Sequence, residues 1–173
     1  MNYQTFEYPY ASKLNDSLFN HIRLEIIRLN LSTVQGGGHQ THQHFHKREL
    51  REVDILTTWI TNLIPQACKG FVYSGEEEEG DPSFTTTAFE IDTCWGIIYN
   101  KGEGVVKHNH FPYALSFVYF VKTPPRSSPF ILEGKRIKAE EGKLIIFLSH
   151  QFHRCPPTKS DGRCIIAGNI KFL

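Results

Sequence analysis

The sequence lacks the segments that would direct a chain into or across a membrane. No apolar run approaches the roughly 20 residues that would span a bilayer. Residues 1–7 contain neither the basic stretch nor the apolar stretch of a secretory signal. We therefore expect a cytoplasmic protein that does not bind membranes.

Cysteine is scarce, and the few cysteines are not grouped. The four cysteines form no CxxC pair and have no zinc-ribbon spacing; they are Cys68, Cys94, Cys155 and Cys164. Widely spaced cysteines in a chain without a signal segment are typical of reduced thiols. We predict that each is a buried, apolar side chain.

A surplus of charge of one sign is also missing. The 173 residues include 19 Lys and Arg against 18 Asp and Glu, a formal net charge of +1. This balance excludes a chain built for general nucleic-acid binding. With 40% apolar and 21% charged residues, the composition is that of a globular protein, and the length predicts a single domain over residues 1–173. Histidine is abundant by contrast, with nine residues, and it is the commonest metal ligand.

Apolar residues recur every three or four positions in two segments of the first half, which predicts two amphipathic helices. The first covers residues 14–29. The second covers residues 50–64, and we expect Pro65 to end it. Between the two helices, residues 36–46 form a glycine-led loop that contains His39, His42, His44 and His46.

The second half changes to short β-rich runs separated by turn residues. Their spacing of about 8–12 residues is typical of an antiparallel sandwich or barrel. Helices followed by strands predict an α+β fold, with the helices on one face of a β-sandwich. Residues 76–79, which are consecutive glutamates, are expected in a solvated turn. The predicted strands are residues 71–74, 84–90, 95–99, 105–110, 115–121, 129–132, 144–148 and 163–172.

Three histidines and one arginine in this half have the spacing of a metal site. His108 and His110 flank Asn109 at the end of a predicted strand, where alternation directs both imidazoles to one face and Asn109 away. His153 follows 43 residues after His110, and Arg163 lies ten residues further on. Three ligands on one face of Fe(II) leave positions for a bidentate co-substrate and O2. A buried arginine nearby could grip a carboxylate of that co-substrate.

At these residues the sequence resembles the Fe(II)- and 2-oxoglutarate-dependent oxygenases, in particular a small phage and marine-bacterial branch related to prolyl hydroxylases. The similar stretches are residues 94–102, 108–120, 142–153 and 163–170. The resemblance implies a double-stranded β-helix, or jelly roll, over about residues 69–173, with residues 1–68 as a helical support region. It also implies a hydroxylase that uses Fe(II), O2 and 2-oxoglutarate, releases succinate and CO2, and acts on a small-molecule or peptidyl substrate.

The resemblance also implies roles for single residues. His108 and His153 match the two histidine ligands of the family, and Arg163 matches the basic residue that binds the C5 carboxylate of 2-oxoglutarate. Tyr99 matches a strand tyrosine that supports the same co-substrate. Asn169 matches a polar position that contacts substrate or co-substrate, unless it only makes a hydrogen bond between strands.

One position departs from the family pattern. The wider superfamily has Asp or Glu two residues after the first histidine, and this chain has His110 there. His110 is then either a neutral third ligand or a bystander that leaves two protein ligands, and we favour ligation. Three neutral ligands give the site more positive charge than a set with a carboxylate, which favours the binding of anions.

The remaining histidines and Trp95 could have purely structural roles or functional ones. The histidines within residues 39–46 are polar loop residues, a second metal site, or part of a loop over the mouth of the active site. His150 is expected at the surface or beside the metal site, and Trp95 in the core.

Two other functions stay open at this point. A cupin-type metalloenzyme would share the fold, but no glutamate follows His110 at the cupin spacing, and Arg163 has no role there. A jelly roll without catalysis could act as a binding module, although it need not keep His108, His153 and Arg163 together. The residue pattern favours neither a particular substrate nor a particular oligomeric state.

Overall fold

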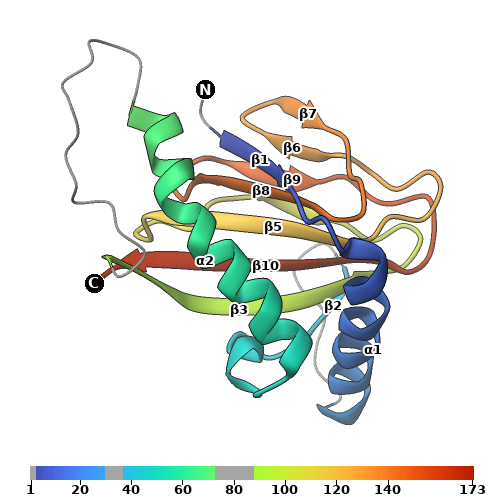
Figure 1. The fold of residues 1–173 in the computed structure, drawn as a ribbon. Coiled ribbons are helices and arrows are strands. Elements are labelled where there is room, and N and C mark those ends of the chain that lie inside the picture. Colours follow the sequence, from blue (N-terminus) through green and yellow to red (C-terminus); the bar gives the residue numbers. More distant parts are fainter. Residues whose placement is uncertain (1–2, 30–36, 73–87) are drawn as a thin grey trace.

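The computed structural model describes residues 3–29, 37–72 and 88–173 of the chain (Figure 1). Two long helices and a short 3-10 turn precede most of the strands. In chain order the elements are β1 (Tyr3–Glu7), α1 (Ala11–Leu29), β2 (His39–Gln40), η1 (Phe45–Lys47), α2 (Arg51–Val72), β3 (Phe89–Tyr99), β4 (Val105–His108), β5 (Leu115–Lys122), β6 (Phe130–Leu132), β7 (Lys135–Ile137), β8 (Lys143–Leu148), β9 (His153–Cys155) and β10 (Arg163–Phe172).

The strands form two antiparallel sheets that make a jelly roll. The larger sheet has six strands in the order β1-β8-β5-β10-β3-β2, and the smaller has four in the order β4-β9-β6-β7. Sequence neighbours are mostly not spatial neighbours: β10 pairs with both β3 and β5, and β9 pairs with both β4 and β6. This is the double-stranded β-helix of an α+β protein, as predicted.

Both helices cover one face of the larger sheet (Figure 1). Alternation along β5 explains the arrangement: Phe117 and Tyr119 point towards the helices, whereas Val118 and Phe120 point towards the other sheet. The helices meet the sheet with residues spaced three or four apart, including Leu14, Leu18 and Ile22 of α1 and Val53, Leu56, Ile60 and Ile64 of α2. The helices therefore brace the larger sheet from outside and leave its inner face free to form a site.

The contact between α1 and β3 requires a glycine. A Cβ atom added to Gly96 would lie 2.5 Å from Cγ1 of Ile22, which is closer than the two atoms can approach. Gly96 therefore lets the helix pack directly on the backbone of β3. The inner face of that strand carries Trp95, Ile97 and Tyr99, so this contact supports the wall of the site described below.

Four short strands were not predicted from the sequence: β1, β2, β7 and β9. They have two to five residues each, which is too short for alternation to stand out. β1 lies at the edge of the larger sheet and pairs with β8. Its Tyr3 packs on the core between the sheets and its Phe6 on the core beneath the helices, so a strand completes the region expected to be helical support.

The expectation that Pro65 ends the second helix is wrong, because α2 continues to Val72. Pro65 lacks the N–H that would bond to the carbonyl of Thr61, which costs about 3 kcal/mol in a helix interior. Burial of Ala67 and Cys68 in the core beneath the helices offsets this cost. Residues 71–72 are consequently helical and not part of a strand, and residues 73–74, 76–79 and 84–87 lie outside the described residues.

The cysteines agree with their predicted role. All four are free thiols and all four are buried. None of the described helices is both long and apolar enough to cross a bilayer.

Candidate active site

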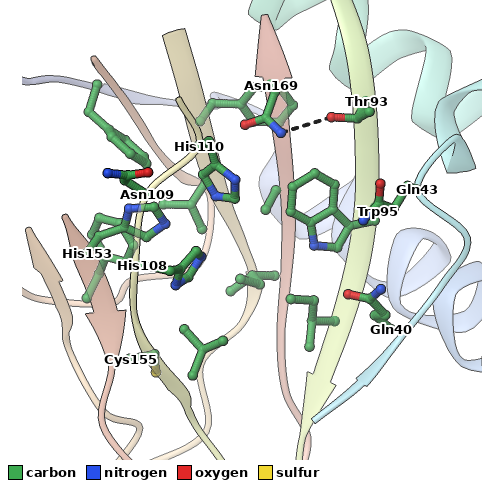
Figure 2. Close-up of a pocket in the computed structure, with 18 of the residues that line it drawn as sticks. Gln40, Gln43, Thr93, Trp95, His108, Asn109, His110, His153, Cys155 and Asn169 are labelled. Atoms are coloured by element: carbon green, nitrogen blue, oxygen red, sulfur yellow. Dashed lines mark hydrogen bonds between the residues drawn. The ribbon is translucent and has the colours of Figure 1, made fainter. Parts of the chain in front are cut away.

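Three histidines meet in one cavity between the two sheets (Figure 2). His108 ends β4 and His153 begins β9, and the two are direct partners in the strand register. The ring centroids lie 4.3 Å apart for His108 and His153, 4.9 Å for His108 and His110, and 5.0 Å for His110 and His153. One ligand atom from each imidazole lies within 4.8 Å of the others. Small side-chain rotations would let all three bind one divalent ion.

The backbone orients two of these imidazoles for metal binding. The Nδ1 atom of His108 lies 2.8 Å from the carbonyl oxygen of Val106, and Nδ1 of His153 lies 3.2 Å from that of Gln151. Each carbonyl can only accept, so Nδ1 carries the proton and donates it. The Nε2 atom of each ring is then free of its proton and available to a metal.

His110 is held by different contacts. Its backbone N–H donates to the carbonyl oxygen of Ser149 at 2.8 Å, and its ring packs edge-on against Trp95 with centroids 5.8 Å apart. Asn109 also lines the cavity, contrary to the expectation that it would point away. The reason is that β4 ends at His108, so regular alternation stops there.

Burial keeps two of the three histidines neutral. Burial first, and the nearby His108 second, lower the pKa of His110 to about 4. The same two causes lead in lowering the pKa of His153 to about 3. Both rings are therefore neutral near pH 7, and the neutral imidazole is the form that coordinates a metal.

The cavity that holds the histidines has a volume of about 470 Å³ and draws its lining from both sheets. Apolar side chains of the inner core form much of its wall, among them Phe130, Phe147 and Ile165. No Asp or Glu is among the described residues that line it. A small polar ligand bound here would thus contact apolar walls and would meet no negatively charged side chain.

Arg163, at the start of β10, is a buried cation in the same cavity. It is fully buried, with a solvent-exposed fraction of 0%, and its Nη1 donates to Sγ of Cys155. Its guanidinium lies 5.2 Å from the ring centroid of Tyr99 and 5.7 Å from that of Phe120. Within the described part of the chain, no carboxylate pairs with it and its Nε has no hydrogen-bond partner. Such a charge is costly unless a bound anion compensates it.

Tyr99, on β3, lies beside Arg163. It is the register partner of Arg163 between β3 and β10, and it lines the cavity. Burial raises the pKa of Tyr99, so its phenol stays neutral and can donate a hydrogen bond. Tyr99 and Arg163 thus offer adjacent donors at one end of the cavity.

Asn169 lines the cavity and also belongs to a hydrogen-bond chain across the larger sheet. Its Oδ1 accepts from Oγ of Ser116 at 2.8 Å, and its Nδ2 donates to Oγ1 of Thr93 at 3.0 Å (Figure 2). Ser116 in turn lies 2.7 Å from Oγ of Ser149, the residue whose carbonyl holds His110. Since the Ser116 hydroxyl proton goes to Asn169, Ser149 donates to Ser116. The strand hydrogen bond expected of Asn169 is therefore present, and one proton of its Nδ2 remains available to a ligand.

The histidines of residues 39–46 do not join the triad. Among the described residues, only His108, His110 and His153 group as potential metal ligands. Pairing of β2 with β3 instead brings Gln40 and Gln43 into the cavity wall. The sequence gives no signal for these two glutamines, because their position depends on a strand of two residues. His150 is exposed and outside the cavity, as expected for a surface residue.

Comparisons with solved structures show which known proteins share this fold. The chain is similar to a viral collagen prolyl hydroxylase from Paramecium bursaria Chlorella virus-1, which was solved with 2-oxoglutarate. The two structures superpose with a TM-score of 0.73 and 14% sequence identity, over 100% of this chain and 97% of the other. The chain has the fold of the prolyl hydroxylases. A Pseudomonas putida prolyl-4-hydroxylase gives a TM-score of 0.69 with 15% identity, over 98% of this chain and 92% of the other.

A Trichoplax adhaerens prolyl hydroxylase, solved with a peptide fragment of hypoxia-inducible factor, gives a TM-score of 0.62 with 14% identity over 97% and 83% of the two chains. No protein-family model matches the sequence, and the search of curated proteins finds no match. The relationship to the prolyl-hydroxylase fold is thus one of structure and not of overall sequence.

Proposed function

We propose that this protein is a non-haem Fe(II)- and 2-oxoglutarate-dependent dioxygenase that hydroxylates a C–H bond of its substrate and releases succinate and CO2. The observation that carries the proposal is one cavity that holds three imidazoles able to share a metal ion and a buried arginine without a carboxylate partner among the described residues. A dication fits the first feature and a dicarboxylate fits the second, and both requirements are met by Fe(II) with 2-oxoglutarate. The prolyl-hydroxylase fold supports the same assignment.

In this proposal His108, His110 and His153 hold the iron. Bound iron would supply the one-electron and O2 chemistry that side chains cannot provide. The Nδ1–H donors of His108 and His153 fix their rings through backbone carbonyls, and the backbone of His110 is fixed through Ser149. Two of the three rings are therefore oriented before the metal arrives, and small rotations would complete the site.

Arg163 would bind the C5 carboxylate of 2-oxoglutarate and thereby set the orientation of the co-substrate. Its free Nε and the adjacent phenol of Tyr99 provide donors for that carboxylate. Asn169 would give its remaining Nδ2 proton to the co-substrate or to the substrate. The apolar wall around these groups excludes water, which strengthens each of these polar contacts.

The substrate is proposed to be a small molecule or a peptidyl segment, and the peptide complex of the Trichoplax relative supports the second. We also propose that residues 1–173 form one domain, because both helices share a core with the larger sheet. The four free, buried thiols support a cytoplasmic location.

Succinate production tests the proposal directly. Anaerobically purified protein is loaded with Fe(II) and 2-oxoglutarate, O2 is added, and succinate is measured; slow formation without substrate is the expected result. Arg163→Ala should retain the metal and lose 2-oxoglutarate binding, whereas Arg136→Ala, at an exposed arginine of β7, should change neither. Metal-loaded protein that binds no 2-oxoglutarate and forms no succinate would instead favour the cupin-type or binding-module alternatives.

A further inference from the structure

The wall of the cavity opposite the histidines is formed by β2, β3 and the segment that follows β2. Trp95, Gln40 and Gln43 all line the cavity on this side (Figure 2). Trp95 is only 8% exposed, and its indole nitrogen borders the open space between the two walls (Figure 2). We refer to these three residues as the donor wall.

The donor wall presents hydrogen-bonding groups without protein partners. Within the described ranges, the indole Nε1–H of Trp95 and the side-chain amides of Gln40 and Gln43 make no hydrogen bond. An indole N–H can only donate, so Trp95 requires an acceptor. This N–H is not fully enclosed by the protein and opens into the cavity, so it can donate to a bound ligand. The wall is thus prepared for an acceptor group on a ligand.

Charge indicates which kind of acceptor fits. A divalent metal and Arg163 bring three positive charges, and the 2-oxoglutarate dianion cancels two of them. One positive charge would then remain, because all three proposed metal ligands are neutral and no described residue lining the cavity is acidic. A carboxylate in place of His110 would have removed this surplus.

Two acidic side chains that contact the surroundings of the cavity do not supply the missing charge. Asp92 lies beside the cavity residue Tyr113 and accepts from its hydroxyl at 2.9 Å, but its other oxygen pairs with Lys171 at 2.8 Å. Glu103 accepts from the backbone of Asn100 and lies 3.6 Å from His39. Neither carboxylate lines the cavity.

We propose that the donor wall is a subsite for a carboxylate of the primary substrate, so that the substrate is an organic acid bound together with 2-oxoglutarate. The carboxylate accepts the indole N–H of Trp95 and an amide N–H of Gln40, and it balances the surplus positive charge. The apolar part of the substrate lies towards the mouth, where Val106 and Phe111 line the cavity and are 48% and 76% exposed. The inference depends on the proposed function, because the surplus charge arises only with the metal and 2-oxoglutarate in place.

Two probes that differ only in charge test the subsite. Zn(II)-loaded protein saturated with 2-oxoglutarate is titrated calorimetrically with N-acetyl-L-proline, which has a carboxylate, and with N-acetyl-L-prolinamide, which has a neutral amide. The carboxylate probe should bind at least about tenfold more tightly, because charge-assisted hydrogen bonds are about twice as strong as neutral ones. Equal affinities, or no binding of either probe at millimolar concentration, would overturn the inference.

The two tryptophans of the chain provide a matched pair of variants. Trp95→Phe keeps an aromatic ring in the wall but removes the N–H, and it should weaken the carboxylate probe about fivefold to tenfold. Trp59→Phe makes the same change in α2, where Trp59 packs against Tyr8 and Tyr119, and should leave the affinity unchanged. An unchanged affinity in Trp95→Phe contradicts the subsite.

Two further experiments test the role of charge and show whether the inference or the proposed function fails. His110→Asp lowers the charge of the site by one and should abolish the preference for the carboxylate probe. Sodium chloride that displaces the carboxylate probe with comparable affinity would indicate an inorganic anion site and overturn the inference. If 2-oxoglutarate itself does not bind, the proposed function fails and the inference with it; if it binds and succinate forms without any carboxylate preference, the inference alone fails.

Discussion

At the scale of single residues, His110 is the position that decides how this site differs from a carboxylate-containing one. Its ring lies within reach of the same ion as His108 and His153, and burial keeps it neutral. We predict that His110→Ala weakens Co(II) binding by more than about 100-fold, because loss of a ligand costs more than the 10–100-fold typical of an outer-shell partner.

Trp95 can report this binding directly. In a Trp59→Phe background the remaining indole lies 5.8 Å from the His110 ring, so we expect Co(II) to quench its fluorescence. His110→Ala should abolish the quenching at the same Co(II) concentration, while His150→Ala, at an exposed histidine, should not. Full quenching in His110→Ala would show that the other two histidines suffice.

Arg163 should show opposite effects on stability and on ligand binding. A buried charge without an ionic partner is costly, so an apolar side chain of similar length in its place should be neutral or stabilising. We predict that Arg163→Met leaves the free energy of unfolding of the ligand-free protein unchanged or raises it, and lowers 2-oxoglutarate affinity by more than about 100-fold. Urea unfolding and calorimetry measure the two quantities, with Arg136→Met as the control. A large loss of stability would mean that the fold itself uses the charge.

At the scale of elements, close packing of α1 on β3 supports the wall of the site. A Cβ at position 96 would lie within 2.5–2.8 Å of three side-chain carbons of Ile22, so Gly96→Ala should lower the free energy of unfolding by about 1–3 kcal/mol. Adding Ile22→Val or Ile22→Ala should recover part of that loss if the overlap is its cause. Thermal or urea unfolding of the single and double variants measures the coupling, and an additive result would contradict this explanation.

The helices and strands also show which parts of the fold and of the site could be predicted from the sequence. The long periodic helices and strands are predictable because burial imposes a period on many residues, and His108, His153 and Arg163 lie at strand ends as their spacing predicts. His110 lies beyond the end of β4 and is held by the carbonyl of Ser149 instead. The two-residue β2 has no such period, so the placement of Gln40 in the cavity wall could not be predicted. Pro65 failed as a stop signal because burial of Ala67 and Cys68 in the core outweighs a lost hydrogen bond. That Arg163 lacks a partner likewise depends on which side chains meet in space.

At the scale of the whole molecule, the buried histidines couple folding to pH. The pKa of His110 is lowered to about 4, that of His153 to about 3, and that of His46 is lowered as well, in each case first by burial. In the unfolded chain the same groups titrate near about 6.5. Between these values the unfolded chain binds more protons than the folded one, so stability is fully present above about pH 6.5 and is lost as the pH falls towards the folded values.

We therefore predict that the metal-free protein loses unfolding free energy steadily from about pH 6.5 to pH 5, by up to about 1.4 kcal/mol per pH unit for each such histidine. Few carboxylates titrate in this window, so it isolates the histidines. Urea unfolding at several pH values measures the slope, and His110→Asn with His153→Asn should reduce it. At these two rings protons should not compete with Zn(II) between about pH 6.5 and pH 5, because His110 and His153 stay neutral in the folded protein down to about pH 4 and about pH 3, so the stabilisation by Zn(II) should change little across the window. A flat pH profile of the metal-free protein would mean that these rings are not buried in solution.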